Sequence, residues 1–349
     1  MEEGMNSKER FLAALMGQQP DRTPLAHVAA LTTVELQDIT GCYMPEVHHS
    51  PEQLARLCAA NHDVLGFDAV TFNINYFGEP AALGCDMDWG SRTRLPTYTS
   101  HPWARAEDAR IPENLLDRTP IREYLETIRI AKRDYGDHMA VLGKVMGPFS
   151  MVQVMYGVEN TLIGLLDEPD KIKQFLDVAV DILVACANAQ FEAGIDALAI
   201  GEGGAGGNML SPRMHRALLV DVHRRMIAGI HGPTIMHICG DITPRLDSLA
   251  QTGITCFNFD WAIQPTAMRK VAEGKFAIMG NVNTTNLLMS NPEEIEKQVI
   301  DNLVAGVDIV SPGCAISPEC PNTNLQAMAR AIARWHRDGK EGVLRPAQR

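Results

Sequence analysis

Residues 233–239 read PTIMHIC, a nearly continuous apolar run of the kind that forms a parallel strand buried on both faces. Seven more such runs recur along the chain, and amphipathic helical patterns separate the later ones. They are PLAHVAA (24–30), AVTFNIN (69–75), MAVLGKV (139–145), ALAIGEG (197–203), ITCFNFD (254–260), FAIMGNV (276–282) and VDIVSPG (307–313). Eight strands alternating with helices predict an α/β fold, a closed (β/α)8 TIM barrel.

The helical segments between the later strands carry matched start and stop signals. Residues 211–229 begin with Ser and Pro, and residues 291–306 begin with Asn and early acids and end at Gly. An open doubly wound sheet is the main alternative, but it would usually have a Gly-rich phosphate turn after its first strand. The Gly run at 201–207 instead follows a middle strand and fits neither dinucleotide nor P-loop spacing. The barrel is therefore favoured.

The composition narrows the class of protein. The 349 residues carry a formal net charge of -12 and no basic stripe, which argues against nucleic acid as a partner, and no apolar window is long enough for a membrane span. The eight cysteines are scattered through apolar segments, as suits a reducing cytoplasm. We predict one domain over residues 1–349, with an N-terminal helical extension and an irregular excursion at about 76–138.

His237 and Cys239 lie two residues apart in the run 233–239, so on a strand they project from the same face. Cys314 follows the eighth predicted strand, and in TIM barrels the carboxyl ends of the strands converge on the active site. One nitrogen and two sulfurs form a set that zinc prefers, and ligands spread over distant strands are typical of a catalytic site with an open fourth position. The alternative is two buried cysteines and a core histidine. Cys320 is a rival third sulfur, ranked lower because it lies farther past the strand.

Three motifs then resemble a known family: HICGD (237–241), MGNVNTTNLL (279–288) and PGCAISP (312–318). They are similar to the uroporphyrinogen decarboxylase superfamily, and specifically to its zinc-dependent methylcobamide:coenzyme M methyltransferase branch. The opening ERFLAALMGQQPDRTP (9–24) and EAGIDALAI (192–200) extend the resemblance over roughly residues 7 to 340. The superfamily fold is also a (β/α)8 barrel.

This resemblance implies that His237, Cys239 and Cys314 bind Zn2+. The implied reaction transfers a methyl group from a methylcobamide, carried by a separate corrinoid protein, to a small thiol such as coenzyme M. Homocysteine and tetrahydrofolate remain alternative acceptors. The chain is not expected to hold its own corrinoid, because DVHRRM (221–226) lacks the final Gly of a cobalt-ligating DxHxxG loop and lies in a predicted helix. The Gly-rich loop at 201–207 is expected to leave room for the carrier.

The decarboxylase branch of the superfamily implies arginines near the first strand and an Asp at the end of the second. This chain has LAHVAALTTVELQ (25–37) and NINYFGEP (73–80) there, without either residue. A decarboxylase therefore remains a disfavoured alternative. A non-catalytic binding protein on this fold is disfavoured by the intact HxC and PGC motifs.

Four more residues are candidates for the site. Glu202 and Asp260 follow the fourth and sixth predicted strands, where each carboxylate is a candidate to bond a metal ligand, fill the fourth metal position or accept the thiol proton. The alternative for both is to cap a neighbouring helix. Asn281 and Asn283 lie after the seventh strand and would contact a corrinoid or thiol, or bond their own turn. His27 is expected to pack in the core.

Overall fold

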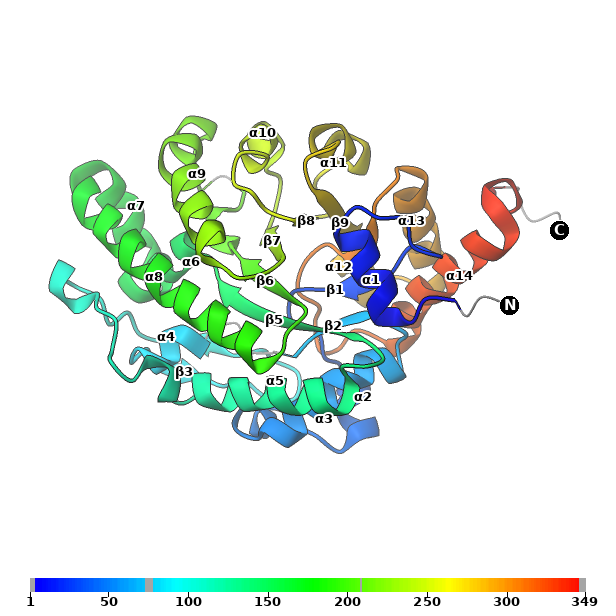
Figure 1. Ribbon diagram of the computed structural model, residues 1–349, viewed down its shortest axis with the longest axis horizontal. Helices are drawn as coiled ribbons and strands as arrows, with labels where there is room; N and C mark the ends of the chain where they lie inside the picture. Colours follow the sequence, from blue (N-terminus) through cyan, green and yellow to red (C-terminus); the bar gives the residue numbers. More distant parts are fainter. Residues whose placement is uncertain (1–3, 73–77, 208, 345–349) are drawn as a thin grey trace.

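The computed structural model describes residues 4–72, 78–207 and 209–344, and its eight parallel strands form a ring with helices around it (Figure 1). An isolated parallel bridge between Leu25 and Val310 joins the first strand to the last and closes the ring. The strands, in their order around the ring, are β1 (Ala26–His27), β2 (Ala69–Thr71), β5 (Ala140–Met146), β6 (Ala197–Gly201), β7 (Thr234–Ile238), β8 (Cys256–Phe259), β9 (Ala277–Val282) and β10 (Ile309–Pro312). The predicted TIM barrel is confirmed.

Each strand lies within its predicted apolar run, or extends one residue past it in β5, and residues 73–75 of the run AVTFNIN (69–75) lie outside the described residues. Helices follow most strands and lie on the outside of the ring (Figure 1). The main helices are α1 (Ser7–Leu15), α2 (Val34–Thr40), α3 (Pro51–Asp63), α5 (Ile121–Tyr135), α6 (Pro148–Tyr156), α7 (Val158–Asp167), α8 (Pro169–Ala193), α9 (Pro212–Gly229), α10 (Leu246–Leu249), α11 (Pro265–Ala272), α12 (Thr284–Met289), α13 (Pro292–Val304) and α14 (Asn322–Leu344). The predicted helical starts at Ser211 and Asn291 are confirmed, because each side chain accepts a hydrogen bond from the first turn.

The barrel interior is filled by small and branched apolar side chains from alternate strand positions. One buried cluster of these residues comprises Ala26, Val28, Ala69, Ala140, Leu142, Ala197, Ala199, Ile235, Cys256, Ala277, Met279 and Ile309. The helix α1 adds Phe11, Ala14 and Leu15 to the same cluster, so the N-terminal extension covers one end of the barrel. The site must therefore open at the other end.

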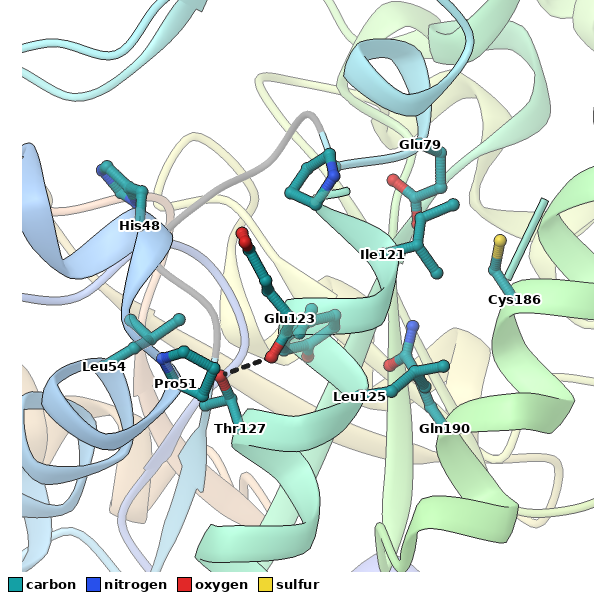
Figure 2. Close-up of a pocket in the computed structure, with 13 residues that line it drawn as sticks. His48, Pro51, Leu54, Glu79, Ile121, Glu123, Leu125, Thr127, Cys186 and Gln190 are labelled. Carbon is teal, nitrogen blue, oxygen red and sulfur yellow. Dashed lines mark hydrogen bonds between the residues drawn. The ribbon is translucent and has the colours of Figure 1, made fainter. Parts of the chain in front are cut away.

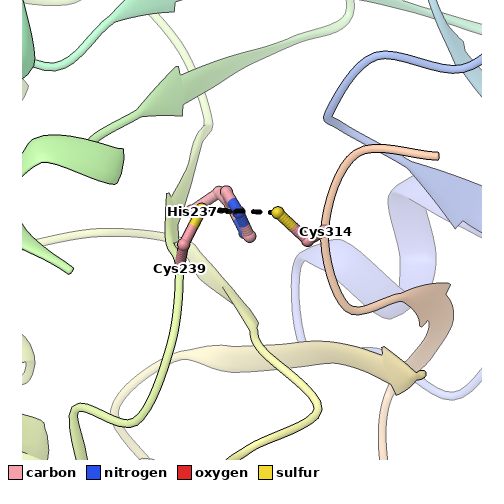
Figure 3. A group of neighbouring side chains, drawn as sticks. All are labelled: His237, Cys239 and Cys314. Atoms are coloured by element: carbon pink, nitrogen blue, oxygen red, sulfur yellow. Dashed lines mark hydrogen bonds between the residues drawn. The ribbon is translucent and has the colours of Figure 1, made fainter. Parts of the chain in front are cut away.

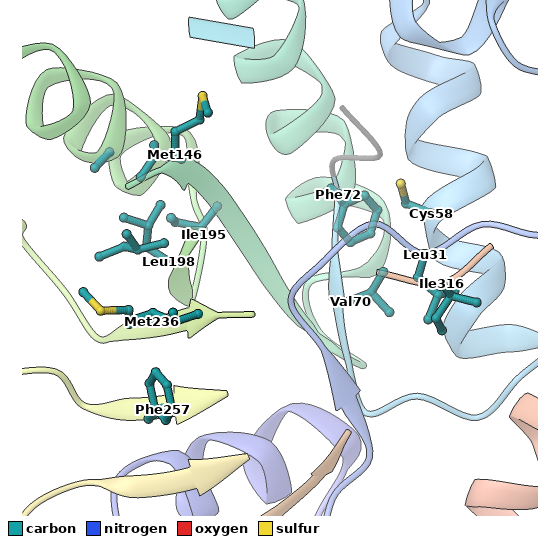
Figure 4. Close-up of a cluster of buried hydrophobic side chains, with 14 of the residues drawn as sticks. Leu31, Cys58, Val70, Phe72, Met146, Ile195, Leu198, Met236, Phe257 and Ile316 are labelled. Atoms are coloured by element: carbon teal, nitrogen blue, oxygen red, sulfur yellow. The ribbon is translucent and has the colours of Figure 1, made fainter. Parts of the chain in front are cut away.

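A second, larger core lies between the strands and the outer helices. The side chains of Leu198, Met236 and Phe257 project from consecutive strands into this layer, as Figure 4 shows. They alternate along the strands with the inward-facing residues of the barrel interior, so each strand is covered on both faces. This double burial is why the runs read as continuously apolar.

The predicted excursion at about 76–138 is described from residue 78 onward, where short elements precede a regular helix. It contains α4 (Gly78–Ala82), a hairpin of β3 (Met87–Asp88) and β4 (Thr97–Tyr98), and the 3-10 turns Ala106–Asp108 and Leu115–Asp117. Its last part is α5, which packs on α3 and α8 in the outer ring. No helix among the described residues is both long and apolar enough to cross a membrane.

Candidate metal centre

The structure brings His237, Cys239 and Cys314 together at the open end of the barrel (Figure 3). His237 is on β7, Cys239 is the residue after this strand, and Cys314 lies two residues after β10. The Nε2 of His237 is 3.1 Å from the Sγ of Cys239, which is 3.3 Å from the Sγ of Cys314. All three donor atoms lie within 4.8 Å of one another. The geometry thus fits one metal ion with three protein ligands.

A backbone contact fixes the tautomer of His237. Its Nδ1 lies 3.2 Å from the carbonyl oxygen of Asn258 on β8. Because a carbonyl oxygen can only accept, Nδ1 carries the hydrogen and Nε2 presents its lone pair to the two sulfurs. Second-sphere bonds of this kind orient histidine ligands in metal sites. His237 is therefore prepared for coordination through Nε2.

The two thiols of the cluster differ in acidity. The hydrogen bond from Cys314 lowers the pKa of Cys239, although burial and the charge of Asp260 act in the other direction. The same bond, together with burial, raises the pKa of Cys314 to about 12. In the metal-free protein Cys239 is thus the first of the pair to become a thiolate, and Cys314 donates its S–H to it. A metal ion bound by both sulfurs would displace their protons.

Glycines let the loop after β6 pack tightly around Cys239. A Cβ added to Gly206 would lie 2.4 Å from the carbonyl oxygen of Cys239, and the amide of Gly207 donates to this oxygen at 3.2 Å. Arg245, which is buried, donates from Nη1 to the carbonyl oxygen of Ala205 at 2.7 Å and so holds the same loop. Gly206 is therefore explained by close backbone packing beside the cluster.

The cluster forms part of the wall of a pocket of about 240 Å3. Apolar side chains line most of it, and Ser150 and Gln153 of α6 add polar groups. The residues that line this mouth pocket are Ala29, Tyr98, Met146, Ser150, Gln153, Val154, Gly203, Gly204, His237, Cys239, Cys314 and Ala315. A small molecule in this pocket would reach the two sulfurs.

Glu202 lies outside the cluster and is fully buried. Its carboxylate accepts hydrogen bonds from the amides of Phe149 and Ser150 at 3.2 and 2.7 Å, and from the Ser150 hydroxyl at 2.8 Å. The Nε2 of His223 on α9 lies 2.9 Å from the same carboxylate. Glu202 therefore caps the first turn of α6, where Gly147 offers no side chain at the N-cap. The capping role considered for it in the sequence is the one found.

The other candidate residues are also engaged in local contacts. The Oδ1 of Asp260 accepts from the amide of Ala262 at 2.9 Å. The amide of Asn281 donates to the carbonyl oxygens of Asp260 and Ile263 at 3.1 and 2.8 Å. Asn283 is the N-cap of α12. Both asparagines thus support the loops after β8 and β9, as in the alternative considered for turn residues.

Cys320 and His27, which the sequence analysis did not favour as site residues, lie apart from the cluster. The thiol of Cys320 donates to the carbonyl oxygen of Leu287 at 3.1 Å, and burial raises its pKa to about 12. His27 is buried, as expected, and burial lowers its pKa to about 3. Among the described residues, only His237, Cys239 and Cys314 form a group of three or more metal-ligand side chains.

Lys144 is a residue that sequence reasoning missed. It is the one charged residue in the run MAVLGKV (139–145), and it is only 3% exposed. Alternate residues of a strand project from the same face. Leu142 projects into the barrel interior and Met146 lines the mouth pocket, so Lys144, between them, lies on the inward face of β5. A lysine within an apolar strand run was the available signal.

The comparisons with known proteins show the family of the chain. The family model for uroporphyrinogen decarboxylase (URO-D) matches residues 6–335, so the chain belongs to this family. The chain is 31% identical over 329 residues to methylcobamide:CoM methyltransferase MtaA of Methanosarcina barkeri, covering 93% of this chain and 96% of that protein. It is 30% identical over 328 residues to a methylated-thiol–coenzyme M methyltransferase of Methanosarcina mazei, covering 94% and 89%.

A solved structure and a more distant relative complete the comparison. The structure of a methyltransferase from Methanosarcina mazei superposes with a TM-score of 0.92 at 30% identity, covering 95% of this chain and 99% of that one. A uroporphyrinogen decarboxylase of Geotalea uraniireducens is 25% identical, covering 93% of this chain and 98% of that protein. The predicted resemblance to the methyltransferase branch is confirmed, and with it the predicted class of enzyme, a methyltransferase.

Proposed function

We propose that this chain is a zinc-dependent methyltransferase that moves a methyl group from a methylated corrinoid on a separate protein to a small thiol such as coenzyme M. The observation that carries the proposal is the convergence of one imidazole nitrogen and two cysteine sulfurs within 4.8 Å at a pocket. The similarity to methylcobamide:CoM methyltransferases supports the donor and the acceptor.

The ligand set fits zinc, which binds thiolate sulfur and imidazole nitrogen with four ligands. A bound Zn2+ would supply the positive charge that keeps an acceptor thiol deprotonated near neutral pH. His237, Cys239 and Cys314 would hold the ion and leave a position for the acceptor sulfur. The apolar lining of the mouth pocket, which includes Met146 and Val154, would keep water from this sulfur.

The other predicted site residues have different parts in this proposal. Asp260 follows β8, and its charge acts on the thiol of Cys239. It would accept the proton that the acceptor loses. Glu202, Asn281 and Asn283 would act indirectly, because their side chains hold α6 and the loops after β8 and β9. They would keep the mouth in shape for the corrinoid carrier.

The proposal includes a reducing compartment such as the cytoplasm, because Cys239 and Cys314 must stay reduced to bind metal. Their sulfurs are 3.3 Å apart, and both are partly exposed. An oxidised pair would have no thiolate to offer.

The test is demethylation of methylcobalamin, followed by its absorption spectrum, with coenzyme M, homocysteine or tetrahydrofolate as acceptor. We expect the zinc-loaded protein to transfer the methyl group to a thiol, with coenzyme M the first choice. Protein stripped by a chelator should be inactive and should recover on adding Zn2+. Transfer that continues unchanged in stripped protein, or that occurs with none of the acceptors, would overturn the proposal.

A further inference from the structure

Lys144 occupies an unusual place for a lysine, between the apolar interior of the barrel and the mouth pocket. Two residues before it, Leu142 belongs to the interior cluster, and two residues after it, Met146 lines the mouth pocket with Cys239 and Cys314. Inward positions of a strand alternate, so Lys144 lies on the same face at the level between them. Its side chain is buried below the thiols.

The surrounding structure fixes this position. The side chain of Gln190 on α8 accepts from the amide of Lys144 at 2.8 Å and donates to its carbonyl oxygen at 2.9 Å. The neighbouring strand β6 places Ala199 beside it in register. A small side chain at this point leaves space within the barrel for the long lysine side chain. The pairing of β5 with β6 and the two hydrogen bonds to Gln190 therefore fix the backbone position of Lys144.

Three acidic groups act on the ammonium of Lys144. Burial lowers its pKa to about 7, whereas Cys314, Cys239 and Glu79 raise it. Glu79 lies on α4 in a second pocket, which it shares with Cys186 and Gln190 (Figure 2). Burial also raises the pKa of Glu79 to about 7. The charges of a buried carboxyl and of the two thiols thus both act on Lys144.

The charge of the proposed site changes when the acceptor binds. Two cysteine thiolates and one divalent ion sum to zero, and an acceptor that arrives as a thiolate adds one negative charge. Among the described residues that line the mouth pocket none is a lysine or an arginine, and residues 73–77 contain neither in their sequence. A buried net charge is costly unless an opposite charge lies near it. Lys144 provides this charge.

We propose that Lys144 is a positioning residue whose buried positive charge selects the thiolate form of the acceptor at the His237, Cys239 and Cys314 site. The inference rests on the proposed function, and it explains why the enzyme would accept a thiol in preference to a neutral acceptor. A thiolate gains from the ammonium below the sulfurs, whereas a neutral acceptor such as the amine of a folate does not. The charge acts at a distance and takes no part in bond making.

The test measures binding of coenzyme M to the zinc-loaded protein by calorimetry, without a methyl donor, in two buffers that differ in ionisation enthalpy. The wild-type protein should release less than one proton per bound thiol at pH 7, because the free thiol is mostly protonated there and Lys144, whose pKa is about 7, takes up part of that proton. In Lys144→Met we expect the Kd to rise at least about tenfold, as for loss of a unit charge next to a buried anion. Zinc content should stay at the wild-type level.

Two matched variants complete the design. Lys144→Arg keeps the charge and should recover most of the affinity. Lys173→Met removes the same charge from an exposed position of α8 and should change neither the Kd nor the proton release. Wild-type affinity and proton release in Lys144→Met would overturn the inference. A wild-type protein that takes up no zinc or binds no thiol would instead overturn the proposed function.

A second measurement covers a Lys144→Met protein that fails to fold. Glu79→Gln removes a carboxyl that raises the pKa of Lys144, so the ammonium should be lost at a lower pH and the affinity for the thiolate form should begin to fall at a lower pH than in the wild type. An unchanged pH dependence of the thiol affinity in Glu79→Gln would contradict the role of Lys144.

Discussion

Two polar clusters lie near the carboxyl ends of the barrel strands, one after β6 and one at the ends of β7 and β10, and they differ in how their atoms are bonded. The carboxylate of Glu202 is fully buried and accepts from two amides and a hydroxyl, with His223 as a further partner. The cluster of His237, Cys239 and Cys314 is partly exposed to a pocket, and its donor atoms contact mainly one another. The carboxylate oxygens of Glu202 are satisfied by protein groups alone. The donor atoms of His237, Cys239 and Cys314 keep lone pairs with which they could bind a metal ion, and the thiols can lose their protons when it binds.

This difference predicts a structural role for the Glu202 cluster and a metal-binding role for the cluster of His237, Cys239 and Cys314. A carboxylate whose oxygens are already bonded to the first turn of a helix stabilises that helix and has little capacity for a metal. Two thiols joined by a hydrogen bond can release their protons when a cation binds their sulfurs. Substitutions in the two clusters should therefore affect different quantities.

The largest effect is expected from Cys314→Ala. It removes one of three proposed metal ligands, so methyl transfer should fall by at least about a thousandfold and bound zinc should be lost. The free energy of unfolding of the metal-free protein should change little, because the thiol is partly exposed. Methylcobalamin demethylation and metal analysis check the prediction, with Cys320→Ser as the control. Equal loss in the control would remove the distinction between the two cysteines.

Glu202→Ala should lower the stability of the fold and leave zinc binding intact. It leaves two amides, the Ser150 hydroxyl and His223 without their acceptor. We expect the free energy of unfolding to fall by about 3 kcal/mol, as for buried polar networks that lose one partner. Denaturant titration measures it, and Glu159→Ala, an exposed acid in the first turn of α7, is the control. A stable Glu202→Ala protein that cannot bind zinc would mean that the carboxylate serves the metal instead.

A smaller, graded effect is expected in the labelling of thiols in the metal-free protein. Cys239 should react first with iodoacetamide near pH 8, since the bond from Cys314 lowers its pKa. Cys320 should react much more slowly, because burial raises its pKa to about 12. Mass spectrometry of peptides over time gives the order. Zinc should protect Cys239, and labelling of Cys320 before Cys239 would contradict the assigned acidities.

The smallest effect is expected from Asn283→Ala. Its side chain accepts from the amides of Thr285 and Asn286 as the N-cap of α12. Loss of such a cap costs about 1 kcal/mol in the free energy of unfolding. The Kd for zinc should be unchanged, because Asn283 lies outside the cluster. A large rise in this Kd would show that the loop after β9 contributes to the metal site.

Much of this arrangement could be predicted from local sequence. Continuous apolar runs located the strands because both faces of each strand are buried, and strand parity paired His237 with Cys239. The position of Cys314 followed from the shared end of parallel strands. The choice between metal ligand and buried thiol for Cys314 and Cys320 needed the resemblance to a family and then the distances.

The partners of Glu202 could not be predicted, because they depend on how α6 and α9 approach the end of β6. Phe149 and Ser150 are more than 50 residues away in sequence and His223 is 21 residues away. No local pattern encodes such contacts. The surroundings of Lys144 could not be predicted for a related reason. The alternation of the strand showed which face it lies on, but the charges that act on it come from α4 and from the residues after β7 and β10.

The central claim is an open metal position at His237, Cys239 and Cys314, and zinc-edge X-ray absorption tests it most directly. The spectrum of the zinc-loaded protein should fit two sulfurs at about 2.3 Å and at least one nitrogen at about 2.0 Å. Coenzyme M should raise the fit to three sulfurs in the wild type. Zinc without sulfur ligands, or a sulfur number that stays at two when thiol is added, would contradict the account.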